Sequence, residues 1–124
     1  KKVNNEKINY AVKLAQLDKL IKNKKNGLNY SVGDDGSRLS GGQIKRIGIA
    51  RSLYQMPQVL IYDEITSSLD KETEQSIIKT LVALTKKLTV IFITHRPDIV
   101  KGKNVTKYIL SNKGNSTKLI KYKK

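Results

Sequence analysis

The hexapeptide Val59-Leu60-Ile61-Tyr62-Asp63-Glu64 decides the predicted fold. It follows Pro57, which cannot continue a helix, and its apolar residues are typical of a short buried strand. A helix is predicted to begin at Asp70 as N-cap, because acidic residues fill its first turn and two lysines its last. Thr89 to Ile93 is a second apolar run of strand length. Strand, helix and strand in succession indicate an α/β fold with a parallel sheet.

Two more helices are predicted upstream of this unit. Apolar residues recur at helical spacing over residues 8–21, which indicates one amphipathic helix. Ser40 and Gln43 have the S-x-x-Q spacing of a capping box, so a second helix is predicted from Ser40 to about Tyr54. Its predicted buried side chains are Ile44, Ile47, Ala50 and Leu53. Residues 31–37, between the two helices, are rich in Gly and Asp and are predicted to form a loop.

The C-terminal part has the pattern of a hairpin, with Val105 to Leu110 and Lys118 to Tyr122 flanking a turn-forming stretch from Asn112 to Asn115. With 124 residues and no internal repeat, the chain has the length of about one small domain. It contains no cysteine, which excludes disulfides and thiolate metal sites. Its longest apolar runs have four residues, far below the ~18–20 that a membrane span needs.

The net charge of +15 raises the question of nucleic-acid binding. The excess lies at the two ends of the chain, because residues 1–25 and 101–124 each hold eight lysines, while basic and acidic residues nearly balance between them. Only three tyrosines, Tyr10, Tyr108 and Tyr122, lie among these lysines, which is too few for a series of stacking platforms for bases. We therefore expect no nucleic-acid partner and interpret the lysines as solvated surface.

The run Leu39-Ser40-Gly41-Gly42-Gln43 is suited to binding phosphate. A helix N-terminus has unpaired amides and a partial positive charge, and both attract anions. Two glycines allow the backbone to approach a ligand closely, and Ser40 adds a hydroxyl donor. An isolated S-x-x-Q would be interpreted as a plain capping box, so the assignment depends on the motifs downstream.

Asp63 and Glu64 end the first predicted strand, and an apolar strand that ends in two carboxylates is typical of a site for a nucleoside triphosphate and Mg²⁺. In an extended strand neighbouring side chains point to opposite sides, so different functions are expected for the two carboxylates. His95, the only histidine, lies just beyond the C-terminal end of the second predicted strand, which is where ligands of open α/β sheets gather.

These features occur together, and in this order, in one family. Leu39 to Gln43 matches the signature motif without a substitution, and Leu60 to Glu64 matches Walker B. Ser67-Ser68-Leu69-Asp70 matches the D-loop, and Thr94-His95-Arg96 matches the H-loop. Over essentially its whole length the chain resembles the C-terminal part of the nucleotide-binding domain of an ABC transporter of the exporter type. The resemblance implies a partial P-loop NTPase fold, a parallel sheet flanked by helices, with a remnant of the α-helical subdomain at the N-terminus.

The resemblance also implies a function for each site residue. Asp63 would bind Mg²⁺, Glu64 would polarise the attacking water, and His95 would contact the γ-phosphate and hold the water and Glu64 in place. The residues implied in ATP binding are Ser40, Gly41, Gly42, Gln43 and Asp70. In the family two such domains stack head to tail, so the signature residues of one chain complete the ATP site of the other.

The implied activity is ATP hydrolysis that energises export, at the cytoplasmic face of the inner membrane. The implied partners are a second ABC ATPase domain and the transporter's transmembrane domains. The loop at residues 32–36 is similar to the segment that lies against cytoplasmic helices of the transmembrane partner in exporters. Residues 1–124 are thus expected to be the C-terminal portion of one ABC ATPase domain. Residues 1–37 would belong to the helical subdomain, and 38–124 would carry the signature helix, Walker B, D-loop, H-loop and C-terminal strands.

The sequence departs from the family pattern mainly by an absence. It contains no G-x-x-x-x-G-K-[ST] loop, so we expect a piece of a longer protein that neither binds ATP tightly nor hydrolyses it alone. Lys45 and Ile65 replace more frequent residues and are expected not to touch the chemistry.

Two alternatives stay open. One is a soluble ABC-type ATPase of DNA repair or translation, although Gln43 favours an exporter. The other is a non-catalytic fragment that binds a partner through its basic ends, although the intact Glu64 and His95 argue against it.

Overall fold

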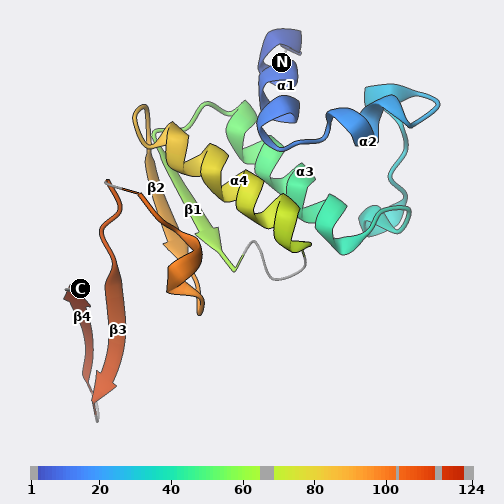
Figure 1. The fold of residues 1–124 in the computed structure, drawn as a ribbon. Coiled ribbons are helices and arrows are strands. Elements are labelled where there is room, and N and C mark those ends of the chain that lie inside the picture. Colours follow the sequence, from blue (N-terminus) through green and yellow to red (C-terminus); the bar gives the residue numbers. More distant parts are fainter. Residues whose placement is uncertain (1–2, 65–68, 103, 114–115, 122–124) are drawn as a thin grey trace.

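The computed structural model describes residues 3–64, 69–102, 104–113 and 116–121 (Figure 1). The helices are α1 (Asn5–Leu14), α2 (Asp18–Lys22), α3 (Gly41–Tyr54) and α4 (Lys71–Leu84), with short 3₁₀ turns η1 (Gly27–Asn29), η2 (Asp34–Gly36) and η3 (Pro97–Ile99). The strands are β1 (Val59–Asp63), β2 (Thr89–Ile93), β3 (Tyr108–Lys113) and β4 (Ser116–Lys121). The predicted α/β class is confirmed.

Strands β1 and β2 pair in parallel, and the chain crosses between them through α4. Val59 pairs with Thr89 and Asp63 with Ile93, so both strands end at the same edge of the sheet. The predicted strand, helix and strand unit is therefore present. It brings the residues that follow the two strands to one edge, where the candidate site lies.

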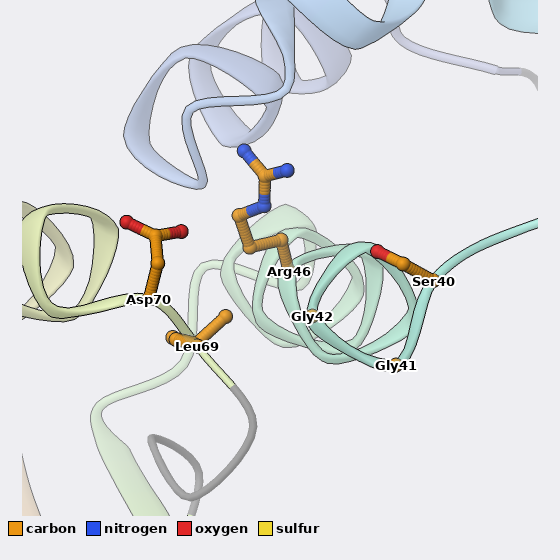
Figure 2. A pocket seen from close by; sticks show the side chains of 6 residues that line it. All are labelled: Ser40, Gly41, Gly42, Arg46, Leu69 and Asp70. Carbon is orange, nitrogen blue, oxygen red and sulfur yellow. The ribbon is translucent and has the colours of Figure 1, made fainter.

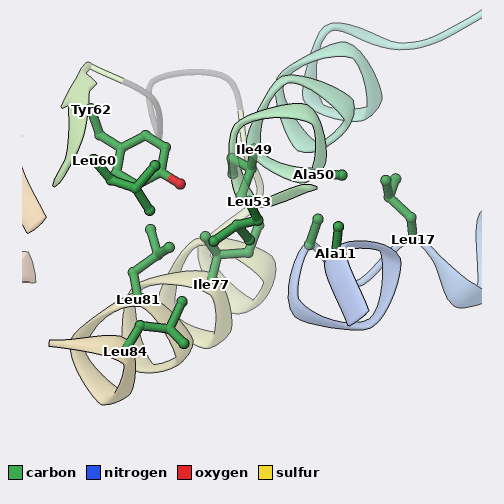
Figure 3. Close-up of a cluster of buried hydrophobic side chains, with 11 residues drawn as sticks. Ala11, Leu17, Ile49, Ala50, Leu53, Leu60, Tyr62, Ile77, Leu81 and Leu84 are labelled. Carbon is green, nitrogen blue, oxygen red and sulfur yellow. The ribbon is translucent and has the colours of Figure 1, made fainter. Parts of the chain in front are cut away.

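The hydrophobic core lies between the helices and one face of this sheet (Figure 3). Leu53 of α3 and Leu81 of α4 are almost completely buried, and they meet the side chains of β1 that point to the same side. One of these is Tyr62, whose ring lies 6.0 Å from that of Phe92. Burial raises the pKa of the Tyr62 hydroxyl to about 12. The core thus fixes α3 and α4 relative to the sheet.

The opposite face of the sheet is exposed, so the prediction of buried strands is confirmed for one face and wrong for the other. Strand residues alternate between faces, which sends Leu60 and Tyr62 toward the helices. Their neighbours point the other way, and 44–64% of their surface is accessible. These exposed residues are Val59, Ile61, Ile91 and Ile93. In the described part of the chain the helices cover only one face.

The single helix predicted over residues 8–21 is also wrong, because the structure has two helices with a break between them. Gln16 adopts a left-handed conformation with φ of 56°, and its N–H donates to the Lys13 carbonyl at 3.1 Å. The Leu17 N–H donates to the Val12 carbonyl at 3.0 Å. These two bonds form a Schellman motif, which ends α1 and turns Leu17 into the core.

Helix α3 begins and ends as predicted, but its buried face is rotated from the predicted one. Ala50 and Leu53 are buried as expected, whereas Ile44 is 42% exposed and Ile47 only half-buried. Ile49, which was not predicted, is fully buried. The helix packs against α1 as well as against the core beneath the sheet, so its apolar contacts extend over more than one stripe.

Strands β3 and β4 form the predicted antiparallel hairpin, with Ile109 opposite Ile120 and Leu110 opposite Leu119. The first strand begins three residues later than expected, at Tyr108. Part of the predicted turn, Gly114 and Asn115, lies outside the described residues, as does Tyr122. No helix in the described ranges is long and apolar enough to cross a membrane.

Candidate functional site

The edge where β1 and β2 end brings Glu64 and His95 together. Asp63 is the last residue of β1, and its partner Ile93 is the last residue of β2. Nε2 of His95 lies 2.8 Å from Oε1 of Glu64. The His95 side chain is 93% exposed and that of Glu64 48% exposed, so both can reach a ligand from solvent. We call Asp63, Glu64 and His95 the carboxylate edge.

The backbone of Glu64 is not extended, contrary to the expectation of a continuing strand. Its φ is 44°, in the left-handed region that non-glycine residues rarely adopt. The Glu64 N–H donates to the Ile93 carbonyl at 3.0 Å, and its carbonyl accepts from Nζ of Lys45 at 3.2 Å. The argument that alternation along a strand separates the two carboxylates therefore does not hold, since the chain turns at Glu64. Unusual backbone conformations of this kind concentrate at functional sites.

The contact of Lys45 with Glu64 was not predicted from the sequence. Lys45 was expected not to touch the proposed chemistry, but its ammonium group contacts the Glu64 backbone. It projects from α3, so it links the helix of the signature run to the carboxylate edge. Nothing in its spacing could have shown this, because 19 residues separate the two partners.

The residues of the carboxylate edge fit one Mg²⁺ ion whose other ligands are mainly the phosphates of a bound substrate. Among the described residues there is no group of three or more metal-ligating side chains. The Asp63 carboxylate is exposed at the end of β1. Mg²⁺ commonly uses one or two carboxylates together with water and substrate phosphates, so a site with so few protein ligands suits this ion.

The start of α3 is a complete capping box, as predicted. Ser40 is the N-cap; its hydroxyl accepts from the Gln43 N–H at 3.3 Å, and its own N–H donates to Oε1 of Gln43 at 3.0 Å. The side chain of Gln43 is thus engaged in the cap. The N–H groups of Gly41 and Gly42, the first two helical positions, receive no partner from the described residues, as is usual at a helix start.

A cleft of about 220 Å³ lies between this helix start and the start of α4 (Figure 2). Its lining residues are Ser40, Gly41, Gly42, Arg46, Leu69 and Asp70. Asp70 is the predicted N-cap of α4, since its carboxylate accepts from the Thr73 N–H at 2.9 Å. This hydrogen bond lowers the pKa of Asp70 below its ordinary value. The remaining predicted D-loop residues, Ser67 and Ser68, and also Ile65, lie outside the described residues.

Arg46 was not predicted as a site residue. It lines the cleft, and its Nη1 donates to the Gln16 carbonyl at 2.9 Å. Its Nε is buried without a hydrogen-bond partner in the described part of the chain. The guanidinium therefore ties the cleft to the break between α1 and α2, which the sequence did not reveal.

An ion pair between α4 and the segment after β2 was missed as well. Nη1 and Nη2 of Arg96 lie 2.9 and 3.1 Å from Oε1 and Oε2 of Glu74. Glu74 was predicted only as a first-turn acid of the helix, yet it is the one buried charged residue of the described chain. An acidic residue facing the same side as buried Ile77 and Ile78 was the available signal.

Known proteins resemble this chain in sequence and in fold. The sequence model of the ABC transporter family matches residues 2–67. The chain is 43% identical over 118 residues to the alpha-hemolysin translocation ATP-binding protein HlyB of Escherichia coli, covering 95% of this chain and 16% of that protein. It has the same identity and coverage with the toxin RTX-I translocation ATP-binding protein of Actinobacillus pleuropneumoniae.

A solved structure of a bacterial Atm1-family ABC exporter with ATP bound is 37% identical and superposes with a TM-score of 0.72. The match covers 77% of this chain and 17% of that one. The fold is thus part of an ABC ATPase, and the chain belongs to the ABC transporter family. It is homologous to the ATP-binding proteins of toxin export, and it spans about a sixth of the length of these curated relatives.

Proposed function

We propose that this chain is part of an ATP-hydrolysing domain that energises export of a substrate across a membrane. The observation that carries the proposal is the 2.8 Å contact between Glu64 and His95 at the edge where two parallel strands end. A carboxylate paired with a histidine in an exposed position is suited to orienting a water molecule and accepting its proton.

In this proposal the carboxylate edge performs the chemistry. Glu64 orients the attacking water by accepting a hydrogen bond from it. His95 holds Glu64 in place and would contact the γ-phosphate of bound ATP. Asp63 would supply the protein carboxylate that binds Mg²⁺. The bound ion would neutralise the negative charge that develops on the phosphates. The protein's contribution is chiefly positioning and electrostatic stabilisation.

The start of α3 serves ATP bound to a second copy or a related domain. Gly41 and Gly42, whose N–H groups have no partner among the described residues, line the cleft together with Ser40. Amides at a helix start are suited to anionic oxygens. Gln43 contributes by holding the cap in shape, and Asp70 by shaping the opposite wall of the cleft. In the full-length protein, two such domains stacked head to tail would complete two sites. Residues 1–124 alone contain no G-x-x-x-x-G-K-[ST] loop, so they would bind ATP weakly and not turn it over.

The proposed partners are therefore a second ABC ATPase domain and transmembrane domains of a transporter, at the cytoplasmic face of the inner membrane. Support comes from the relatives, which are described as translocation ATP-binding proteins and as an exporter. No nucleic-acid partner is proposed, because the basic excess lies at the two ends of the chain with few aromatic residues among the lysines.

The test is the substitution Glu64→Gln in the natural full-length protein. We expect ATP hydrolysis to fall about 10²- to 10⁴-fold, the usual contribution of a general base, while ATP still binds and accumulates in a closed dimer. Turnover is measured by phosphate release, and the dimer by size-exclusion chromatography with labelled ATP.

The matched control is Glu72→Gln, which makes the same chemical change at an exposed position in the first turn of α4. It should retain wild-type turnover. Full turnover in Glu64→Gln would refute the assignment of the base, and a wild-type protein without ATP hydrolysis would refute the proposed function itself.

A further inference from the structure

The Glu74–Arg96 ion pair lies directly beside the carboxylate edge. Both oxygens of Glu74 accept from the two terminal nitrogens of Arg96, at 2.9 and 3.1 Å. Such a fork-to-fork pair fixes orientation as well as distance, which a lysine could not do. The Glu74 side chain is only 4% exposed, whereas that of Arg96 is 59% exposed. Arg96 is thus bound to a buried side chain of α4.

His95, the neighbour of Arg96, lacks an anchor of its own. With 93% of its side chain exposed, packing does not determine where its ring lies. Its side-chain partner among the described residues is Glu64, the residue that it is proposed to assist. The direction of the ring is therefore set by the backbone of the segment that carries it.

That segment is held on both sides of His95. Before it, the Thr94 hydroxyl accepts from the Arg96 N–H at 3.0 Å, which closes a tight turn around His95. After it, the Arg96 side chain reaches α4 and binds Glu74. The turn is thereby fastened to the helix that crosses between β1 and β2.

Folding alone does not explain a buried carboxylate at position 74. Its nearest buried neighbours on the helix, Ile77 and Ile78, are apolar. A well-packed apolar residue commonly serves stability as well as a buried ion pair does, because the pair must first be desolvated. An apolar residue at this position could not make the two oriented hydrogen bonds that hold Arg96.

We propose that Glu74 is a positioning residue for His95. By binding Arg96, it fixes the turn that places the imidazole beside Glu64. This inference rests on the proposed ATPase function. It assigns no contact between Glu74 and the reacting atoms, and the effect of Glu74 passes entirely through Arg96 and His95.

The experiment compares Glu74→Gln, His95→Ala and the double variant in the natural full-length protein. Steady-state ATP hydrolysis gives kcat and KM, and single-turnover hydrolysis is measured as well, since slow residual rates remain accessible in this way. We expect Glu74→Gln to lower the rate about 10- to 100-fold, the effect of a misplacement on the order of 1 Å, with KM for ATP within about twofold. In the His95→Ala background, Glu74→Gln should lower the rate no further, because coupled residues are non-additive.

Two further variants separate positioning from folding. Arg96→Lys keeps the charge but loses the fork, and it should lower kcat with KM unchanged even where Glu74→Gln fails to fold. Glu72→Gln, on the same helix but exposed, should behave as wild type. A full additional loss in the His95→Ala background, or wild-type kcat in both Glu74→Gln and Arg96→Lys, would overturn the proposal. Since wild-type hydrolysis is measured alongside, either result is distinguishable from a failure of the proposed function.

Discussion

The carboxylate edge and the start of α3 are held in place by different kinds of contact. At the start of α3, Ser40 and Gln43 bond each other across three residues of sequence, and at the opposite wall of the cleft Asp70 does the same with Thr73. At the carboxylate edge the bonds that reach other elements of the fold join residues far apart in sequence. Lys45 reaches Glu64 across 19 residues, and Arg96 reaches Glu74 across 22.

This difference determines what can be separated by mutation. A local cap can be rebuilt with another capping residue, so that structure is kept while the ligand-facing group changes. At the carboxylate edge the same contacts place the reacting groups and hold the backbone, so that structure and function change together. The predictions below test this contrast.

Among the variants that test this contrast, Ser40→Asp has the largest expected effect. Aspartate is as good an N-cap as serine, so the first turn of α3 should keep its protection against hydrogen exchange. Its carboxylate would face the phosphate that the helix start is proposed to bind, and like charges in contact cost several kcal/mol. We therefore expect ATP hydrolysis by the natural full-length protein to fall by about 10²-fold.

Ser40→Ala is the counterpart, and it should give the opposite order in the two assays. It removes the cap, which destabilises the helix start by about 1 kcal/mol, but it adds no charge toward the phosphate. Hydrogen exchange at Gln43 should accelerate in Ser40→Ala more than in Ser40→Asp, while hydrolysis should suffer less. If both assays rank the two variants alike, the cap and the ligand contact are not separable.

The same contrast explains which features the sequence revealed. Ser40 with Gln43, and Asp70 with Thr73, were predictable because a side chain and an amide within one turn meet whatever the rest of the fold does. The contact of Glu64 with His95 depends on tertiary structure, but the parallel strands bring both to one edge, so the fold-family pattern implied it.

The remaining features depend on geometry that no spacing encodes. The left-handed φ of Glu64 and the reach of Lys45 follow from how α3 packs against the sheet. Helix α1 ends with Gln16 in the left-handed position that glycine usually occupies. The glycine that would have marked this helix end in the sequence was therefore absent. The bare face of the sheet was missed because a run of apolar residues looks alike whether one face or both are covered.

A smaller effect is expected from Lys45→Met, which tests the long-range support of the edge. Methionine keeps most of the aliphatic length but cannot donate to the Glu64 carbonyl, so the unusual backbone of Glu64 loses one restraint. A hydrogen bond of this exposed kind contributes about 0.5–1 kcal/mol, which corresponds to a roughly two- to fivefold lower kcat. Steady-state hydrolysis by the natural full-length protein measures the loss.

Lys45→Arg is the matched control, since it keeps a donor of similar reach and should restore most of the rate. Equal rates for wild type and Lys45→Met would show that the remaining bonds of Glu64, to Ile93 and His95, suffice to hold it.

The smallest effect concerns the pH dependence of the cap at Asp70. The Thr73 N–H lowers the pKa of this carboxyl below its ordinary value of 3.8. Its stabilisation is therefore fully present above that ordinary value and is lost as the pH falls through the lower, folded-state pKa. As the pH falls from neutral through that lower pKa, the first-turn amides of α4 should lose protection, because protonation weakens the cap. Asp70→Ser caps with a group that does not titrate, so hydrogen exchange at Thr73 should change less with pH in this variant than in wild type. An unchanged pH profile in Asp70→Ser would mean that other carboxyls cause the loss, and that this helix start is less local than its hydrogen bond indicates.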